Sequence, residues 1–284
     1  MAATRLIAVG DNCLDVYLSK NSMAVGGNAL NVAAQWHRQG CDARYFGVVG
    51  KDAEGDVIAT AIEAVGLPGA DLERRDGATA VTLLLEQDGD RRFLLEDLGV
   101  GRNFVPSPER YAALRRADWV HLGTNSSAEL IERLIEDRIR FSIDVSTAHQ
   151  SLDLKGVPLV FASGPDEPKV PVEPVIGALK ERGAARIVLT CGPRGAFFDD
   201  GAELVHVPAQ AVDVVDTCGA GDSFIASFVV AHLLKGMDAG AAMRLATDAA
   251  AGTCLHEGGF PQRLGAIPPW LLRKYAAEIS AAEG

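Results

Sequence analysis

Short apolar runs alternate with longer amphipathic stretches along most of the chain. The runs have the composition of buried strands, and they recur at residues 6–10, 43–49, 118–123, 140–145, 158–163 and 186–190. Between them apolar residues repeat at helical spacing, which predicts helices after Gly27, over 56–65, from Pro108, from Ser126 or Ser127, and over 173–182, 224–234, 238–255 and 269–281. This alternation predicts an α/β fold, a mostly parallel sheet with helices on both faces.

Two hairpins interrupt the alternation, the second across Asp199-Asp200-Gly201. In the first, residues 79–86 are extended, Asp88-Gly89 is a hairpin-turn signal, and the chain returns over 91–95. With residues 16–25, which are also non-helical, we expect a small sheet that covers a polar ligand and excludes water. Four charged residues would then lie near that ligand, namely Arg91, Arg92, Glu96 and Asp97. A solvated edge hairpin explains the same pattern equally well.

Length and charge narrow the functional classes. The 284 residues, 48% of them hydrophobic, suffice for one large α/β domain with a substantial core. We expect a single domain over 1–284, with the small sheet of about 16–25 and 79–98 inserted in it. The net charge of −11 and the lack of a Lys or Arg run argue against a nucleic-acid partner. An anionic nucleotide would therefore be held locally, by backbone N–H groups, a bound cation and a few Arg side chains.

The cysteines and the start of the chain indicate a cytoplasmic protein. The five cysteines are scattered and form no Cys-x-x-Cys or Cys/His cluster, as in a reducing compartment without a zinc site. The first residues run directly into an apolar strand, which leaves too short a lead for a signal peptide. The longest apolar run, 224–234, contains Ser227 and His232 and cannot span a bilayer, so no membrane partner is expected.

Residues 216–224, Asp-Thr-Cys-Gly-Ala-Gly-Asp-Ser-Phe, have the chemistry of an anion-binding turn. An alternating segment with Val212 and Val214 leads into them, and an apolar helix follows. Gly219 and Gly221 allow a tight turn and the close approach of a ligand. The first N–H groups of the helix have no partner inside it, and its dipole favours negative charge, so a phosphate suits this position.

Asp222 is the unusual member of this turn, because a carboxylate beside a phosphate site repels the phosphate. One role that fits is that of a general base, which takes the proton of a hydroxyl that attacks a phosphoryl group. The other is that of a helix cap, a common role of Asp. The turn alone favours neither interpretation.

Polar residues also follow the first strand and open the helix after it. Asp11 and Asp15 lie just beyond the carboxyl end of the strand, where parallel sheets bind ligands. Gly26-Gly27 allows close approach at the next helix start. Asn28 and Asn31 can each donate and accept hydrogen bonds, which suits a polyol. Ordinary turns explain both segments almost as well.

Two of these segments match the signatures of one family. The pattern Gly-Gly-x-Ala-x-Asn-x-Ala, with two later glycines, is present as Gly26, Gly27, Ala29, Asn31, Ala33, Gly40 and Gly50. The pattern Asp-Thr-x-Gly-Ala-Gly-Asp is present as Asp216, Thr217, Gly219, Ala220, Gly221 and Asp222. Together they resemble the two signatures of the PfkB (ribokinase-like) carbohydrate kinases, over essentially the whole chain. The branch that the chain most resembles is that of the fructoselysine 6-kinases, through Val9–Asp15, Gly26–Ala29, Phe161–Ser163 and its short length.

The resemblance implies a ribokinase-like three-layer α/β/α sandwich with a mostly parallel central sheet and a small β-sheet lid. It implies an enzyme that uses ATP and Mg²⁺ to phosphorylate a primary hydroxyl of a sugar or sugar–amine conjugate, with fructoselysine as the first choice. Asp222 matches the catalytic base, and the N–H groups of Gly219, Ala220 and Gly221 match the anion hole.

Further site residues follow from the resemblance or lie beside matching positions. The predicted substrate-binding set, in which Asp15, Gly27 and Asn31 match family positions, is Asp11, Asp15, Gly27, Asn28, Asn31 and Arg91. The predicted nucleotide-binding set, in which Thr190, Gly192 and Gly195 match the turn that holds the nucleotide, is Ser163, Thr190, Gly192, Gly195, Gly219 and Gly221.

The chain departs from the family in its metal-handling residues. Many members carry Asn-x-x-Glu after the middle strand, where the pair organises the nucleotide phosphates and the water shell of magnesium. Here the stretch is Ser163-Gly164-Pro165-Asp166-Glu167, so either Asp166 or Glu167 is expected to act on the metal through water. Asp144 lacks the Asn and Arg that commonly follow it. Some relatives bind a monovalent cation such as K⁺ beside the anion hole, where Asp216 is near enough in sequence to take part.

Three questions stay open at this level. The small sheet is expected to have an apolar face made of Leu83, Leu85, Phe93 and Leu95. This face either pairs with the same face of a second subunit, in a homodimer, or covers the ligand site of a monomer. The acceptor is fructoselysine or another ketose, a sugar acid or a nucleoside. A non-catalytic sugar or nucleotide sensor on the same fold is a further alternative, which the intact Gly219, Gly221 and Asp222 disfavour.

Overall fold

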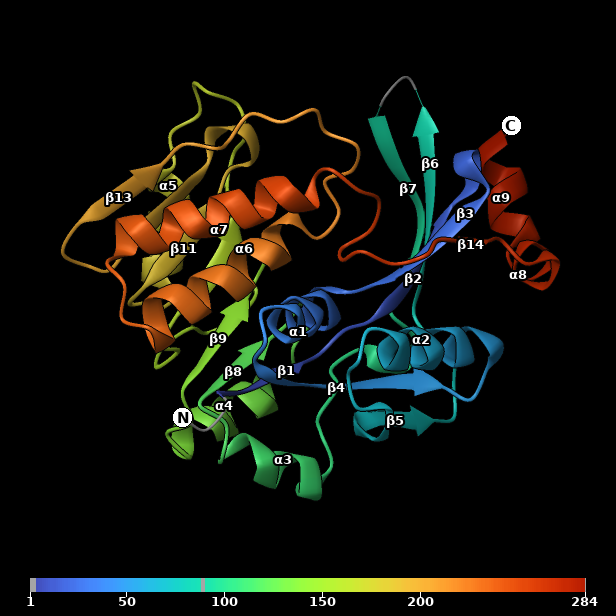
Figure 1. Ribbon diagram of the computed structural model, residues 1–284, viewed down its shortest axis with the longest axis horizontal. Coiled ribbons are helices and arrows are strands. Elements are labelled where there is room, and N and C mark those ends of the chain that lie inside the picture. Colours follow the sequence, from blue (N-terminus) through green and yellow to red (C-terminus); the bar gives the residue numbers. More distant parts are fainter. Residues whose placement is uncertain (1–3, 88–89, 284) are drawn as a thin grey trace.

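The computed structural model describes residues 4–87 and 90–283, with side chains except those of 86–92 and 282–284. It contains two sheets, a large one between layers of helices and a small one that projects from one end (Figure 1). The predicted α/β/α sandwich with a mostly parallel sheet and a small second sheet is confirmed.

The large sheet has nine strands in the order β13-β12-β11-β10-β9-β8-β1-β4-β5. Their bounds are β1 Arg5–Val9, β4 Asp42–Gly50, β5 Leu72–Arg75, β8 Trp119–Leu122, β9 Phe141–Asp144, β10 Val160–Ser163, β11 Ile187–Thr190, β12 Ala196–Asp199 and β13 Leu204–Val207. The strands from β11 to β5 pair in parallel, and β12 and β13 add an antiparallel edge. The carboxyl ends of the parallel strands therefore meet along one side of the sheet, where such sheets bind ligands.

Helices cover both faces of this sheet (Figure 1). One face carries α1 Asn28–Arg38, α2 Ala53–Ala64, α6 Ala220–Phe228, a π-helix Val229–Leu234 that continues α6, and α7 Ala239–Thr253. The other face carries α3 Pro108–Leu114, α4 Ala128–Glu136 and α5 Glu173–Glu181. Alternate residues of β1 fill the two cores: Leu6 and Ala8 pack under α1 and α6, and Ile7 and Val9 pack under the helices of the other face.

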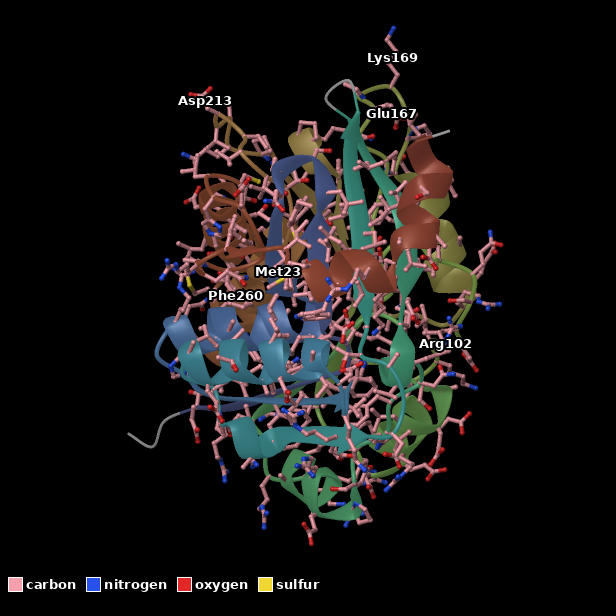
Figure 2. The ribbon with its side chains drawn as sticks, turned by 90° about the vertical axis from the view of Figure 1, so that its right-hand side faces the viewer. Met23, Arg102, Glu167, Lys169, Asp213 and Phe260 are labelled. Carbon is pink, nitrogen blue, oxygen red and sulfur yellow. The ribbon has the colours of Figure 1, made fainter. Side chains whose placement is uncertain are left out.

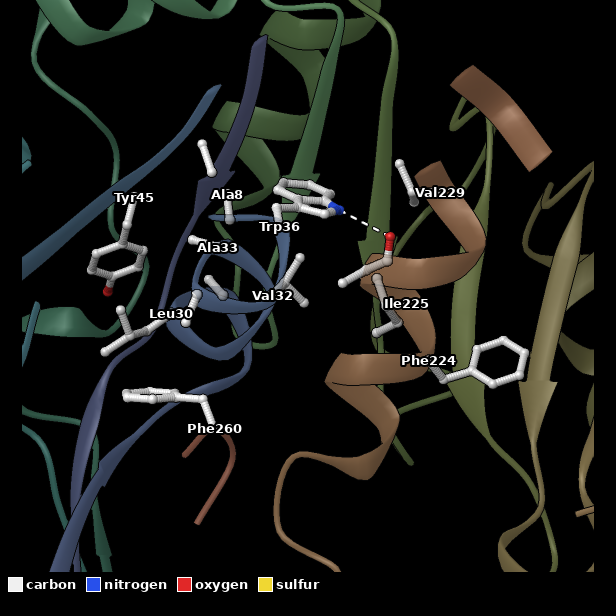
Figure 3. Close-up of a cluster of buried hydrophobic side chains, with 14 of the residues drawn as sticks. Ala8, Leu30, Val32, Ala33, Trp36, Tyr45, Phe224, Ile225, Val229 and Phe260 are labelled. Carbon is white, nitrogen blue, oxygen red and sulfur yellow. Dashed lines mark hydrogen bonds between the residues drawn. The ribbon is translucent and has the colours of Figure 1, made fainter. Parts of the chain in front are cut away.

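Helices α1 and α6 pack directly on each other. Trp36 of α1 is fully buried, and its indole N–H donates to the carbonyl oxygen of Ala226 of α6 at 3.1 Å (Figure 3). Val32 and Ile225 belong to the same cluster of buried side chains. This packing holds the two helices in register with each other, so their amino ends meet at the ligand-binding side of the sheet.

The small sheet has the strand order β14-β3-β2-β6-β7. Its strands are β2 Cys13–Tyr17, β3 Ser22–Gly26, β6 Val81–Gln87, β7 Asp90–Asp97 and β14 Gly265–Ala266. A bulge between Leu83 and Leu84 divides the apolar residues of the predicted hairpin. Leu83 is buried opposite Leu95, whereas Phe93, opposite Leu84, is 62% exposed. The residues expected to share one apolar face therefore do not share it, and the homodimer stays a prediction.

The structure adds elements that the sequence pattern does not predict. β5, with the sequence Leu-Glu-Arg-Arg, is too polar to read as a strand, and β14 is too short. The small sheet begins at Cys13 rather than at residue 16. The helix expected over 269–281 is two helices, α8 Pro269–Lys274 and α9 Ala276–Glu283, separated at Tyr275. Among the described helices, none combines the length and the apolar character that a membrane crossing needs.

Candidate active site

Asp222 lies in the first turn of α6, and two asparagines of α1 hold its carboxylate. The side-chain amides of Asn28 and Asn31 donate to Oδ1 and Oδ2 of Asp222, each at 2.6 Å. Residues three apart on a helix share one face, so both amides reach the same carboxylate. Asp222 is only 9% exposed. The packing of α1 on α6 thus determines where this carboxylate points.

Two further carboxylates lie beside it. Asp144, the last residue of β9, accepts from the same Asn28 amide nitrogen at 2.8 Å, so one nitrogen bridges Asp144 and Asp222. Asp11, just after β1, accepts the backbone N–H groups of Asn28 and Ala29 at 2.8 and 3.3 Å. Helix-start donors have no partner inside the helix, so Asp11 caps α1 from a neighbouring segment. No described Lys or Arg forms an ion pair with any of the three carboxylates.

Burial raises the pKa of Asp222 to about 7. The charges of Asp144 and Asp11 also raise it, whereas the hydrogen bonds from Asn31 and Asn28 lower it. Burial raises the pKa of Asp144 to about 6 and also raises the pKa of Asp11. At neutral pH the Asp222 carboxylate is therefore close to the balance between its two protonation states, which suits a general base.

The turn before α6 leaves some of its backbone N–H groups without a partner. Gly219 is the N-cap residue, with a φ of 73°, and the helix begins at Ala220 rather than at the start of the apolar run. The N–H of Ala220 turns back to the carbonyl oxygen of Thr217 at 3.2 Å. The N–H groups of Gly221 and Asp222 have no acceptor among the described residues, so they are the donors that an anion can use.

The glycines of the two motifs meet different steric needs. A side chain at Gly219 would overlap the backbone of Gly259, and one at Gly27, whose φ is 112°, would overlap the backbone of Asn12. Gly221 differs, because a Cβ there would meet no atom within 4 Å. Close packing and the left-handed conformation therefore require the first two glycines, and the third leaves room for a ligand beside the backbone.

Asp15 lies on β2 of the small sheet, beside the turn before α6. It is buried on β2, and a Cβ on Gly26 would come within 2.7 Å of its Oδ2, so Gly26 makes space for the carboxylate. The Cys13 thiol donates to Oδ1 of Asp15 at 3.1 Å, and the thiol of Cys218 lies 4.0 Å from Oδ2. Asp15 thus links the small sheet to the turn before α6.

Asp216 ties the same segments together. Its buried carboxylate accepts the backbone N–H groups of Cys218 and Gly258 at 2.9 and 3.0 Å, and the hydroxyl of Tyr17 on β2 at 3.3 Å. These bonds give Asp216 a role in shaping the turn. The monovalent-cation site suggested for it stays a prediction.

A cavity of about 690 Å³ opens beside the turn, at the carboxyl ends of β10 and β11. All of the predicted nucleotide-binding residues except Gly219 line it, namely Ser163, Thr190, Gly192, Gly195 and Gly221. Much of the remaining wall is apolar and includes Ala209, Ala211, Val212, Val214, Phe224 and Ala250. The segment with Val212 and Val214 is irregular rather than the alternating strand its pattern suggests. An apolar wall with a few polar groups suits a flat aromatic ligand.

The loop after β10 carries the two candidate metal residues. A Cβ on Gly192, which lines the cavity, would lie 3.4 Å from Cβ of Asp166. Arg194 donates to the carbonyl oxygens of Pro165 and Glu167 at 3.0 and 3.1 Å and so holds the loop. The Glu167 side chain is exposed at the outer end of the molecule (Figure 2). Within the described part of the chain no group of three His, Cys, Asp or Glu side chains is placed to hold a metal ion, so a metal here would depend on water and on a ligand's oxygens.

The structure thus places Asp11, Asn28 and Asn31 around Asp222, and most of the predicted nucleotide-binding residues around the cavity that Gly221 also lines. The side chain of Arg91 lies outside the described side chains. Asp144 of the carboxylate cluster and His121 behind it belong to none of the predicted sets of site residues. Asp144 could have been found, because it ends a predicted strand. His121, which lies 3.4 Å from Asn28 Oδ1, sits inside an apolar strand and gives no such signal.

Comparisons with known proteins point to one family. Residues 2–140 and 164–261 match the pfkB family carbohydrate kinase model. The chain is 31% identical over 272 residues to the fructosamine kinase FrlD of Bacillus subtilis (strain 168), which covers 92% of this chain and 95% of that protein. It is 33% identical over 260 residues to the fructoselysine 6-kinase of Escherichia coli (strain K12), which covers 90% of this chain and 99% of that protein.

Solved structures agree on the fold. The ribokinase of Arabidopsis thaliana, complexed with ribose and ATP, superposes with a TM-score of 0.77 at 19% identity, over 92% of this chain and 96% of that one. The ribokinase of Thermotoga maritima gives a TM-score of 0.75 at 19% identity, over 98% and 99% of the two chains. The sandwich is therefore ribokinase-like.

The raised pKa of Asp222 predicts that part of the stability is lost as pH rises. An unfolded Asp titrates near 3.8, whereas the folded pKa is about 7, so the folded state holds this proton more tightly. The contribution is complete below pH 4 and is lost as pH rises through 7. In urea denaturation, Asp222→Asn should reduce the difference in unfolding free energy between pH 5 and pH 8 by about 1–3 kcal/mol.

Asp213→Asn, which removes an exposed carboxylate, is the matched control and should leave that difference unchanged. If Asp222→Asn and the wild type showed the same difference, Asp222 would not be a desolvated carboxyl group.

Proposed function

Because the chain belongs to the PfkB family of carbohydrate kinases, we propose that it transfers the γ-phosphoryl group of ATP to a primary hydroxyl of a fructosamine. As a family member the protein is an ATP-dependent carbohydrate kinase, and the acceptor is the proposed part. Fructoselysine is the first candidate, since a fructosamine kinase and a fructoselysine 6-kinase are each similar to this chain over at least 90% of its length. The structural observation that carries the proposal is the buried carboxylate cluster around Asp222.

The step proposed for Asp222 is general-base catalysis. The sugar hydroxyl attacks the γ-phosphorus in line, and its proton passes to the Asp222 carboxylate as the new O–P bond forms. The bond from the γ-phosphorus to the bridging oxygen breaks, and ADP leaves with that electron pair. A positioned base contributes about 10²–10⁴ in rate. A pKa of about 7 lets Asp222 accept the proton and release it to water near neutral pH.

The N–H groups of Gly221 and Asp222 would stabilise the charge on the transferred phosphoryl group. Removal of one such donor costs about 10²–10³ in rate in other enzymes. The open space at Gly221 supports this role, because phosphoryl oxygens can reach the backbone there. The apolar wall of the adjoining cavity would take the adenine, and the turn of Gly192 and Gly195 would lie along the nucleotide.

The negative charge of the carboxylates around Asp222 supports a cationic sugar substrate. Asp11, Asp144 and Asp222 lie together without an ion-pair partner among the described residues, and Asp15 is a further buried carboxylate nearby. A fructosamine carries a secondary ammonium group, which these carboxylates would favour over a neutral ketose. Asn31 contributes to this cluster through its amide nitrogen, which holds Oδ2 of Asp222 at 2.6 Å.

The small sheet would act as the lid of this acceptor site. Asp15 and Tyr17 of β2 contact Cys218 and Asp216 of the turn, so a movement of the sheet is coupled to the turn that holds the phosphoryl group. Such a lid would exclude water from the transfer. The whole chain would then work as one kinase domain.

Magnesium would bind together with the nucleotide, through its phosphates and water, rather than in a site made by protein ligands alone. Mg²⁺ keeps several waters and binds through one or two carboxylates and substrate phosphates, where it neutralises phosphate charge. Asp166 fits this arrangement because it lies beside Gly192 at the cavity, whereas no described contact places the Glu167 side chain there. We therefore assign the water-mediated role to Asp166.

A substrate panel tests the acceptor. ADP release is measured with fructoselysine, fructose, a sugar acid and adenosine. We expect kcat/KM for fructoselysine to exceed that for fructose by at least about 10²-fold, because fructose leaves buried carboxylates without a cation. Phosphorus NMR should locate the phosphate on the primary hydroxyl. Turnover of fructose with none of fructoselysine would remove the fructosamine and leave the kinase, whereas binding of both ligands without ADP release would indicate a sensor.

Two neighbouring substitutions test the metal assignment. Asp166→Asn and Glu167→Gln each keep the size of the side chain and remove its charge. At fixed ATP, Asp166→Asn should raise the Mg²⁺ concentration for half-maximal rate by about tenfold, since it loses a group that orders the metal's water shell. Glu167→Gln should change it by less than about twofold. An equal or larger effect of Glu167→Gln would contradict the assignment.

A further inference from the structure

A chain of buried polar groups runs through the sheet behind Asn28. The indole N–H of Trp119 on β8 donates to Ser142 Oγ on β9 at 3.0 Å. Ser142 Oγ lies 3.0 Å from Nδ1 of His121, and Nε2 of His121 lies 3.4 Å from Oδ1 of Asn28. Trp119, His121 and Ser142 are all buried, the last two completely. The chemistry described above uses none of these three residues.

The direction of every hydrogen bond follows from the group at the far end. An indole N–H only donates, so Ser142 Oγ accepts from Trp119. Among the described residues Nδ1 of His121 is the one acceptor within reach of the buried Ser142 hydroxyl proton, so Ser142 donates to it. A neutral imidazole that accepts at Nδ1 carries its proton on Nε2, which therefore donates to Asn28 Oδ1. Burial lowers the pKa of His121 to about 3, which keeps the ring neutral at ordinary pH. With its oxygen held, the Asn28 amide turns its nitrogen toward Asp144 and Asp222.

We propose that Trp119, Ser142 and His121 form a relay that fixes the amide orientation of Asn28 and thereby orients Asp222 and favours its ionised form. The proposal rests on the role of Asp222 as base given above. His121 is a positioning residue, because it acts through Asn28 and does not touch the reacting atoms. A reversed Asn28 amide would bring its oxygen against two carboxylates and would leave each of them one donor short.

The surroundings of Asp222 make this donor important. Among the described residues, Asp11 from the β1–β2 turn and Asp144 from β9 are the charged groups that shift its pKa, and His121 of β8 lies behind Asn28. Both carboxylates raise the pKa of Asp222, and the Asn28 hydrogen bond opposes them. Loss of the orientation of Asn28 would therefore raise that pKa, and fewer molecules would carry the ionised base at neutral pH.

The pH dependence of kcat separates this role from simple packing. His121→Leu removes both ring nitrogens and fills the buried space with an apolar side chain of similar size. We expect the acidic limb of its kcat profile to move up by about one pH unit and kcat at pH 7 to fall about five- to tenfold. Trp119→Phe, which keeps one aromatic ring and removes the first donor, should move the limb in the same direction by less. If His121→Leu does not fold, Trp119→Phe still tests the proposal.

His232→Leu is the matched control. It removes another imidazole that packs against phenylalanine rings, on the π-helix away from the relay, and it should leave the midpoint of the acidic limb in place. Destabilisation alone would lower the active fraction in both histidine variants without moving the limb.

The tautomer of His121 gives a readout that needs no turnover. In protein labelled with ¹⁵N-histidine, the signals absent from His121→Leu should show a protonated Nε2 and an unprotonated Nδ1 at both pH 6 and pH 8. A protonated Nδ1, or an acidic limb that stays in place in both His121→Leu and Trp119→Phe, would overturn the relay. Near wild-type turnover of Asp222→Ala would instead remove the base, while the tautomer would still report whether the relay orients Asn28.

Discussion

Two hydrogen bonds from α1 to the carboxylate of Asp222 organise the ligand-binding end of this protein. They join the amino ends of α1 and α6, which lie far apart in the sequence, and the packing of Trp36 against Ala226 holds the two helices together behind them. Burial of the carboxylate raises its pKa, and the donors from Asn28 and Asn31 limit the rise. The same contact therefore places a proton acceptor and sets its strength.

Close backbone packing makes this contact possible. The loop after α7 lies against the turn before α6, where a side chain on Gly219 would overlap Gly259. Gly259 in turn lies against Asn31, whose amide a side chain at that position would overlap. Gly27 lies in the same way against Asn12. Gly27 and Gly219 of the two motifs, and Gly259, which follows the second, are thus needed so that three segments can meet around one carboxylate.

The sequence predicts the sheet well where strands are buried on both faces, because continuous apolar runs such as β1 and β11 have few other interpretations. It misses β5, whose charged residues lie at the sheet edge, and it runs α8 and α9 together, because the break at Tyr275 is not preceded by glycine or proline. It also groups Leu83 with Phe93 on one face, since the bulge that separates them leaves no mark in the pattern.

In the candidate site, too, some residues could be identified from the sequence and others could not. Residues at strand ends and helix starts, such as Asp11, Asn31 and Gly221, could be selected from position alone. What Asp11 contacts could not, because its partners are backbone groups of α1 that only the fold brings near. His121 and Ser142 could not be identified from the sequence either. The partner of a polar residue in an apolar strand is known only when the neighbouring strands are known.

The base assignment is tested most directly by single-turnover phosphoryl transfer with Asp222→Ala, at saturating ATP and with the acceptor that the substrate panel identifies. Calorimetry on the same variant reports whether nucleotide and sugar still bind. We expect both ligands to bind within a few-fold of the wild-type affinity and the transfer rate to fall by at least about 10²-fold. Transfer at a near wild-type rate would contradict the assignment and would leave Asp222 as a buried residue that holds the start of α6 against α1.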